Sequence, residues 1–498
     1  MRLGLRSLAA AMLIAALAHP AAAAGTMRFV ISSMPPGNGN PHTSGGWPAL
    51  LLWPAMFEAL TEIGPDGTLQ GLLADSWRYE DDTNWVFDLK DGIRFSNGEP
   101  FDAEAAAATI NFLLTEQGQT FSAYREVRTV ARAIPRDRLT LEVKTSQPDS
   151  MIPGRLAGVR MLPRVYFAEA GPGAFGLNPH GTGPFVAERW SSGRVTFVRN
   201  PFAWRPGHLD RVDVAAAPDS TSRVQALISG VVDVAFDLSP TDVQQAVSAG
   251  ATIEYRTRAS VQMWNFITEL ESPLQDKRVR QALNYAVDME TIVATLLQGI
   301  TVPASQAAAR GTFGYDPALK PYPHDPDKAR QLLTEAGFPI GFEITFQVSS
   351  SNPEEEAIYL QVVQDLKAVG VNVDLVSVPY NSQLRMVYGA PWEGKAFNMN
   401  YGSLPSLDPL SAQRYHSCLW QAPWICRPDI AERVLAADRM FDMDERRDIV
   451  RGILRDLHDD PPGIYLYDNV HPDALGPRVA HYDAPFGFIQ YHTLAVTD

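Results

Sequence analysis

A strand, a helix and a second strand follow one another directly between residues 342 and 375, and this succession restricts the fold more than any other part of the sequence. Apolar residues alternate with other residues over 342–348, take helical spacing over 359–366 and alternate again over 371–375. Two strands joined through a helix enter a sheet as parallel neighbours, because parallel strands need a long crossover. The pattern therefore predicts a partly parallel sheet covered by helices.

A further helix is predicted directly before this unit. Asp325 suits the position that caps a helix, Pro326 suits its first turn, and Gly337 suits the left-handed residue that ends it. The second half of the chain therefore alternates helices with strands.

The first half of the chain has a different pattern. Residues 85–89 alternate, Asp91-Gly92 suits a turn and residues 93–95 continue the alternation, which predicts a hairpin. Asp102 is expected to begin a helix with apolar residues spaced over 106–114. This half predicts an antiparallel sheet, so the whole chain is expected to be an α/β protein built from unlike lobes.

The first 24 residues have the three parts of a secretory signal peptide. Arg2 and Arg6 precede an apolar stretch over 8–18, and Ala22 and Ala24 fit a cleavage site. We expect cleavage near Ala24, in preference to a buried N-terminal helix. No cysteine follows the apolar stretch, so no lipid anchor is expected, and no later stretch reaches the roughly 18 apolar residues of a membrane helix.

Charge and length narrow the class of protein. The chain has 57 acidic and 42 basic residues, a formal net charge of −15, which repels polyphosphates and disfavours nucleic acid as a partner. Its 498 residues correspond to about three domains at roughly 150 residues each. With 45% hydrophobic residues the chain can bury a sizeable core.

The only two cysteines are Cys418 and Cys426. In an exported protein they are expected to form a disulfide, because the compartment is oxidising. A metal pair and two free thiols are the alternatives, but only His416 lies nearby as a further ligand.

The sequence has none of the common catalytic or phosphate-binding motifs. It contains no G-x-S-x-G elbow, H-E-x-x-H pair, Walker loop or G-x-G-x-x-G after a strand. The ten histidines include no pair at i, i+4 spacing, and the paired carboxylates are typical of solvated faces. We therefore expect no enzyme activity, cofactor or metal centre, with an exported hydrolase as a remote alternative.

Short segments along the chain, taken together, resemble one known family. The order and spacing of these segments are similar to those of solute-binding family 5, the extracytoplasmic peptide- and nickel-binding proteins of ABC importers. The resemblance covers essentially the whole mature chain. The segments are 57–60, 73–77, 85–89, 92–98, 181–185, Asn200-Pro201, 276–286 and 322–338.

The resemblance implies a fold like that of type II periplasmic binding proteins, in which two lobes close over a cleft and a smaller third domain lies at the periphery. By analogy, lobe I and lobe III form the cleft and lobe II is peripheral. The implied division is 1–24 for the signal peptide; 25–56, 177–262 and 478–498 for lobe I; 57–176 for lobe II; and 263–477 for lobe III.

The implied function is that of a periplasmic substrate-binding component that captures a peptide or peptide-like solute and delivers it to an ABC permease. We expect a monomer. In the family's peptide binders an aspartate in the loop equivalent to 401–409 holds the peptide's amino terminus, but here Pro405 takes that position and Asp408 is expected to shape a turn. Nickel-type relatives also lack that aspartate, so a metal chelate or another non-peptide solute, such as an opine or a glycan, stays open.

The predicted ligand-binding residues combine aromatic surface with polar groups that could orient a solute. Tyr401, Arg414 and His416 would also serve a metal chelate, and Arg414 could bind a carboxylate through two hydrogen bonds. The full predicted set is Trp264, Asn265, Tyr401, Ser403, Arg414 and His416.

Overall fold

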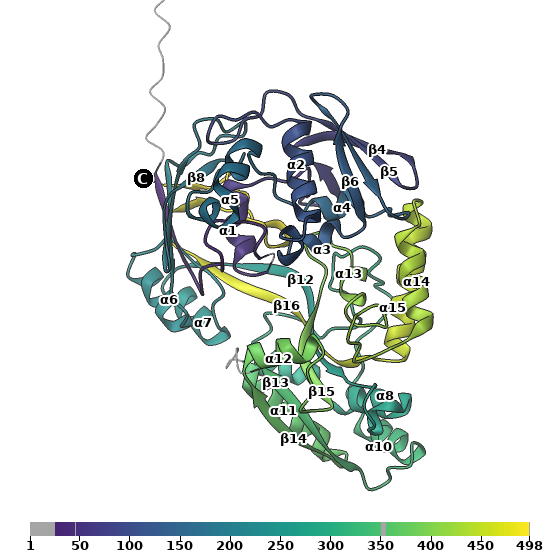
Figure 1. The fold of residues 1–498 in the computed structure, drawn as a ribbon. Helices are drawn as coiled ribbons and strands as arrows, with labels where there is room; N and C mark the ends of the chain where they lie inside the picture. The colour runs from purple at the N-terminus through teal and green to yellow at the C-terminus, as the bar shows by residue number, and fades with distance from the viewer. Residues whose placement is uncertain (1–24, 45, 350–354, 498) are drawn as a thin grey trace, which may run out of the picture.

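A computed structural model describes residues 25–44, 46–349 and 355–497. The predicted signal peptide, residues 1–24, lies outside the described residues. We call residues 25–251 and 476–497 the upper body and residues 267–462 the lower body, as they stand in Figure 1. Two long strands, β12 (Thr252–Phe266) and β16 (Gly463–Leu475), run from one body into the other.

A mixed sheet of ten strands extends through both bodies in the order β14-β13-β15-β12-β16-β11-β1-β10-β9-β8. In the upper body β1 is parallel to β10 and β11, whereas β8 to β10 pair in antiparallel fashion. The strands of the upper body are β1 (Thr26–Ile31), β8 (Phe185–Ser191), β9 (Arg194–Arg199), β10 (Arg211–Ala216) and β11 (Val234–Ala235).

The predicted strand-helix-strand unit is confirmed in the lower body. Strands β13 (Phe342–Ser349) and β14 (Val371–Val378) are parallel over their whole length, and α11 (Glu356–Ala368) connects them. The preceding helix, α10 (Pro326–Glu335), begins as expected, with the Asp325 side chain accepting a hydrogen bond from the Lys328 amide. Gly337 follows it at φ +94°, a conformation that glycine adopts without a steric penalty.

The pairing of β12 with β16 is interrupted between the two bodies. Thr257 pairs with Val470 and Val261 with Asp468, so β12 has three residues where β16 has one. Within this bulge Ala259 takes a φ of +46°. A bulge bends a strand and increases its twist, so the sheet changes direction where the upper body meets the lower one.

A second sheet in the upper body is antiparallel, with the order β4-β5-β7-β6. The predicted hairpin is wrong, because β5 pairs with β4 and β7, and residues 93–95 make only an isolated bridge, between Arg94 and Pro100. The helix predicted after Asp102 is confirmed as α2 (Ala103–Leu114), and Asp102 accepts from the Ala105 amide. The strands are β4 (Ala74–Asp81), β5 (Asn84–Leu89), β6 (Val130–Pro135) and β7 (Thr140–Thr145).

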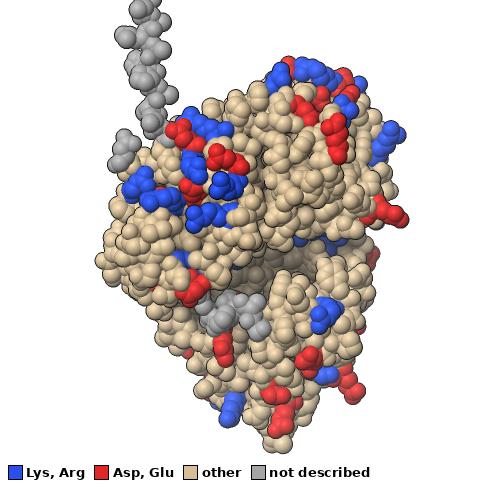
Figure 2. All heavy atoms as spheres, turned by 60° about the vertical axis from the view of Figure 1, so that its left-hand side comes forward, with Lys and Arg blue, Asp and Glu red and all other residues tan. Residues whose placement is uncertain are grey.

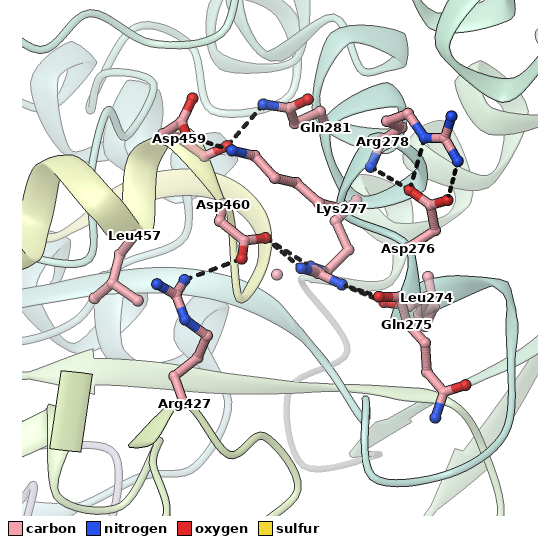
Figure 3. A network of polar contacts seen from close by, with 12 residues as sticks. Leu274, Gln275, Asp276, Lys277, Arg278, Gln281, Arg427, Leu457, Asp459 and Asp460 are labelled. Carbon is pink, nitrogen blue, oxygen red and sulfur yellow. Dashed lines mark hydrogen bonds and ion pairs between the residues drawn. The ribbon is translucent and has the colours of Figure 1, made fainter. Parts of the chain in front are cut away.

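Ion pairs fasten helix α8 (Lys277–Ala286) to the end of α15 (Met443–Asp459). Asp460 accepts hydrogen bonds from Arg280, on α8, and from Arg427, which precedes α14 (Pro428–Asp438) (Figure 3). Arg280 also donates to the Leu274 carbonyl at 2.7 Å. The carboxylate of Asp460 therefore joins three segments of the lower body.

The remaining elements complete the fold, and within the described residues no helix is long and apolar enough to cross a membrane. The predicted lobe boundaries stay a prediction. The remaining helices are α1 (Ala49–Met56), α3 (Tyr124–Val127), α4 (Ile152–Leu156), α5 (Arg164–Leu177), α6 (Ser220–Ile228), α7 (Pro240–Ser248), α9 (Met289–Thr295), α12 (Tyr380–Val387) and α13 (Leu410–Gln413). The remaining strands are β2 (Thr61–Ile63), β3 (Leu69–Gly71), β15 (Ala396–Gly402), β17 (Val479–His481) and β18 (Ala495–Val496).

Candidate ligand-binding site

A cavity of about 280 Å³ lies between the two bodies, and we call it the arginine cavity. Its upper wall comes from α3 and α4, and its lower wall comes from the end of β15 and from residues 411–416. Figure 2 shows a hollow between the bodies, with Lys or Arg atoms at the margin of the upper body. Cavities of a few hundred Å³ that receive side chains from two bodies are common ligand sites.

Four arginines line the cavity, three from the upper body and one from the lower body. Arg125 donates to the neighbouring Glu126 at 2.7 Å. Arg155 pairs with Asp149, and its guanidinium lies 3.6 Å from Asp438. Glu126 is the only carboxylate among the lining residues.

Asp438, at the end of α14, lies behind the cavity and links the two bodies. It forms an ion pair with Arg414 of the lower body and a longer one with Arg155 of the upper body. The backbone carbonyl of Asp438 also accepts from the Ser150 amide at 2.7 Å. This carboxylate therefore holds arginines from both walls close together.

The positive charges in the cavity repel one another. Burial and the neighbouring Arg155 and Arg128 lower the pKa of Arg414 to about 9. Partial desolvation and Arg155 also lower the pKa of Arg128. An anion in the cavity would favour the charged form of both side chains.

Aromatic rings border the lower wall. Tyr388 and Tyr415 line the cavity, and both rings pack against Trp420, with centroid separations of 5.3 Å and 4.7 Å. Trp420 in turn donates to the Val387 carbonyl at 2.7 Å. The cavity thus combines two tyrosine rings with five charged side chains, so its lining is more polar than that of most small-molecule sites.

The predicted disulfide between Cys418 and Cys426 is confirmed. It closes the segment that carries Trp420 and follows the cavity residues Arg414 to His416. No group of three potential metal-binding side chains occurs among the described residues.

The structure places two of the predicted ligand-binding residues on the cavity wall, Arg414 and His416. Tyr401 and Ser403 are buried and do not line the cavity. The ring of Tyr401 stacks on His416 with a centroid separation of 3.7 Å, and burial lowers the pKa of His416 to about 3, so its imidazole is neutral at pH 7.

Trp264 and Asn265 do not line the arginine cavity, because β12 is covered on both faces at this point. Trp264 packs against Phe346 and Tyr359 in the core of the lower body. The side chain of Asn265 donates to the Met399 carbonyl of β15 at 3.0 Å. The sequence reasoning also missed Arg125, Arg128, Arg155 and Tyr388, since no periodicity marks these residues as neighbours of Arg414.

The carboxylate of Asp408 is bound by groups within the protein and is not available to a ligand. Its side chain accepts from the Leu410 amide at 3.2 Å and from Arg446 at 2.9 Å, and it is buried. Pro405 borders two smaller pockets beside the arginine cavity. The loop over 401–409 therefore offers no free carboxylate to a ligand.

Two α/β bodies joined by two long strands, with a cavity lined from both sides, define a periplasmic binding protein of type II. The family model of the bacterial extracellular solute-binding proteins, family 5 Middle, matches residues 68–409 of this chain. The chain belongs to this family, whose members bind solutes.

Known proteins resemble the chain over most of its length. The glutathione-binding protein GsiB of Escherichia coli (strain K12) is 26% identical over 361 residues, which is 70% of this chain and 68% of GsiB. The substrate-binding protein CtaP of Listeria monocytogenes has a TM-score of 0.84 at 21% identity and covers 95% of this chain and 100% of its own. AgaA of A. tumefaciens R10, solved with agropinic acid, has a TM-score of 0.79 at 23% identity and covers 95% and 99%.

Proposed function

We propose that the chain is the periplasmic substrate-binding component of an ABC importer, which captures a small peptide-like or other organic solute and delivers it to the membrane permease. The observation that carries the proposal is the arginine cavity, which receives Arg128 and Arg155 from the upper body and Tyr388 and Arg414 from the lower body. A solute that contacts both walls favours the closed arrangement of the two bodies. The permease would then recognise the closed, solute-bound arrangement.

The signal peptide predicted over residues 1–24 supports a periplasmic location. The protein would act as a monomer, with the permease as its macromolecular partner and nucleic acid disfavoured by the net charge of −15.

Two cargo classes remain as candidates within this function. GsiB is named for glutathione, a peptide, and AgaA was solved with an opine. The lack of a free carboxylate in loop 401–409 favours the non-peptide class over peptides held by their amino terminus. A metal chelate belongs to the non-peptide class, and Arg414 and His416, which both line the cavity, would contact it.

Thermal unfolding of the mature protein, residues 25–498, in the presence of dipeptides, glutathione, opines, glycans and metal chelates tests the proposal. A ligand present at 100 times its dissociation constant should add roughly 2.7 kcal/mol to the free energy of unfolding. If no class raises the melting temperature while a hydrolase assay shows turnover of a substrate, the transport function is wrong.

A further inference from the structure

We propose that the cargo is a small organic acid with a net negative charge and that Arg128 is the residue that anchors its carboxylate. This inference rests on the proposed function and specifies the class of solute. It is carried by the balance of charged partners around the arginine cavity.

The carboxylates near the cavity are too few to neutralise its arginines. Four guanidinium groups line the cavity, and the carboxylates paired with them are those of Glu126, Asp149 and Asp438. One positive charge is therefore left over. This surplus is notable because the chain as a whole carries a net charge of −15.

The surplus charge belongs to Arg128. Arg125 is paired with Glu126, Arg155 with Asp149, and Arg414 with Asp438. Among residues 25–44, 46–349 and 355–497, Arg128 makes no side-chain hydrogen bond or ion pair with another residue. A guanidinium presents five N–H donors in a planar fork, and a carboxylate accepts two of them at once.

The position of Arg128 suits a ligand that holds the two bodies together. Arg128 directly follows α3 on the upper wall, whereas Arg414 comes from the lower wall. The two guanidinium groups are near enough that the charge of Arg128 contributes to lowering the pKa of Arg414. An anion between them would relieve this repulsion only when both walls are in place, so it would bind the closed arrangement more tightly.

The cationic amino terminus of a peptide would find no unpaired carboxylate among the described residues on the wall of the arginine cavity. Glu126 is the one carboxylate on the cavity wall and is already paired with Arg125, while Asp408 is buried against Arg446. The cavity volume of about 280 Å³ lies at the lower end of the range for small-molecule sites and suits a small solute.

Isothermal titration of the mature protein in 0.15 M salt, where the Debye length is about 8 Å, tests the charge preference. Citrate, glutathione and Glu-Glu serve as net-negative probes, Ala-Ala and Ala-Gln as neutral probes, and Lys-Ala as a net-positive probe. We expect at least one net-negative probe to bind and to bind at least tenfold more tightly than every neutral or positive probe. Equal or tighter binding of Ala-Ala, Ala-Gln or Lys-Ala contradicts the inference but leaves the transport function intact. If no probe binds, the inference is wrong. If the wider thermal screen is also negative, the transport function is wrong as well.

Two matched variants test the anchor. Arg128→Gln should weaken binding of the preferred probe by about tenfold or more, the low end for hydrogen bonds to charged groups. Arg132→Gln makes the same change of charge at an exposed position of β6 that does not line the cavity, and its affinity should stay within about twofold of the parent. Equal affinities for the two variants, with unchanged melting temperatures of both unliganded proteins, would remove Arg128 from the site.

Discussion

The guanidinium of Arg446 donates to the Asp408 carboxylate at 2.9 Å, and both side chains are withdrawn from solvent. Arg446 lies on α15 and also donates to the Ala437 carbonyl at the end of α14. This pair therefore fixes the loop over 401–409, which precedes the lower-wall residues 411–416, to α15 and to the end of α14.

Replacement of Asp408 should destabilise the protein. Asp408→Asn leaves the buried Arg446 without its ionic partner, and the free energy of unfolding should fall by about 3 kcal/mol, the low end for a broken buried pair. Urea denaturation followed by tryptophan fluorescence measures the change. Asp444→Asn, whose exposed carboxylate pairs with Arg447 on the same helix, is the control and should cost less than about 1 kcal/mol.

Arg414→Ala should weaken ligand binding and also destabilise the unliganded protein. Loss of a charge-assisted hydrogen bond should cost at least about 1.5 kcal/mol of binding free energy for the preferred organic acid. Because Asp438 would keep only the longer contact with Arg155, the free energy of unfolding should also fall by about 1 to 3 kcal/mol. Calorimetry and urea denaturation measure the two effects, with the exposed Arg439→Ala as control. Unaltered affinity would show that Arg414 only fastens the wall.

The disulfide between Cys418 and Cys426 should be present in exported protein. Titration with a thiol reagent under denaturing, non-reducing conditions should detect no free thiol. Replacing both cysteines with alanine should lower the free energy of unfolding by about 2 to 3 kcal/mol, because the unfolded chain loses a short closed loop. Two reactive thiols in the periplasmic protein would contradict the expectation.

Asp459 and Asp460 offer a comparison between neighbouring carboxylates. Asp460→Asn removes the partner shared by Arg280 and Arg427, so the free energy of unfolding should fall by about 2 kcal/mol. Asp459→Asn removes a contact between two solvent-accessible side chains, Asp459 and Lys277, and should change it by less than about 0.5 kcal/mol. If thermal unfolding shows equal destabilisation by Asp460→Asn and Asp459→Asn, the ion pairs of Asp460 do not account for its effect on stability.

Mild acid should destabilise the protein through buried histidines. Burial lowers the pKa of His42 to about 4, whereas an unfolded histidine titrates near 6.5. As the pH falls, His42 takes up a proton in the unfolded state before it does so in the folded state. The contribution of neutral His42 to stability is therefore present above pH 6.5 and is lost as the pH falls toward 4. His42 alone should cost about 2 kcal/mol between pH 7 and pH 5. The slope of unfolding free energy against pH should decrease in His42→Gln and stay unchanged in His481→Gln, where the histidine is exposed.

Local sequence signals predicted several elements of the fold correctly. The caps at Asp102 and Asp325 and the changes of apolar spacing over 342–375 depend on neighbouring residues, and the corresponding helices and strands are confirmed. The hairpin after residue 85 was wrong because β5 takes its partners from β4 and from β7, which lies over 50 residues later in the chain.

The binding site was harder to predict for the same reason. Arg414 and His416 belong to one segment, and both line the cavity. Arg128 and Arg155 come from the other body, more than 250 residues away along the chain, and only the packing of the bodies brings them to the same cavity as Arg414. Trp264 and Asn265 have suitable chemistry, but the pairing of β12 with β15 and β16 directs them into the core.

The interrupted pairing of β12 with β16 has a mechanical consequence. Two strands cross from the upper to the lower body side by side, so pulling the bodies apart would strain both backbones, whereas twisting at the bulge requires only changes of dihedral angle near Ala259. The joint therefore resists stretching and shear but yields to rotation. Different solutes would then stabilise different angles between the two bodies about one axis of rotation. Spectroscopic labels on the two bodies could measure this angle directly.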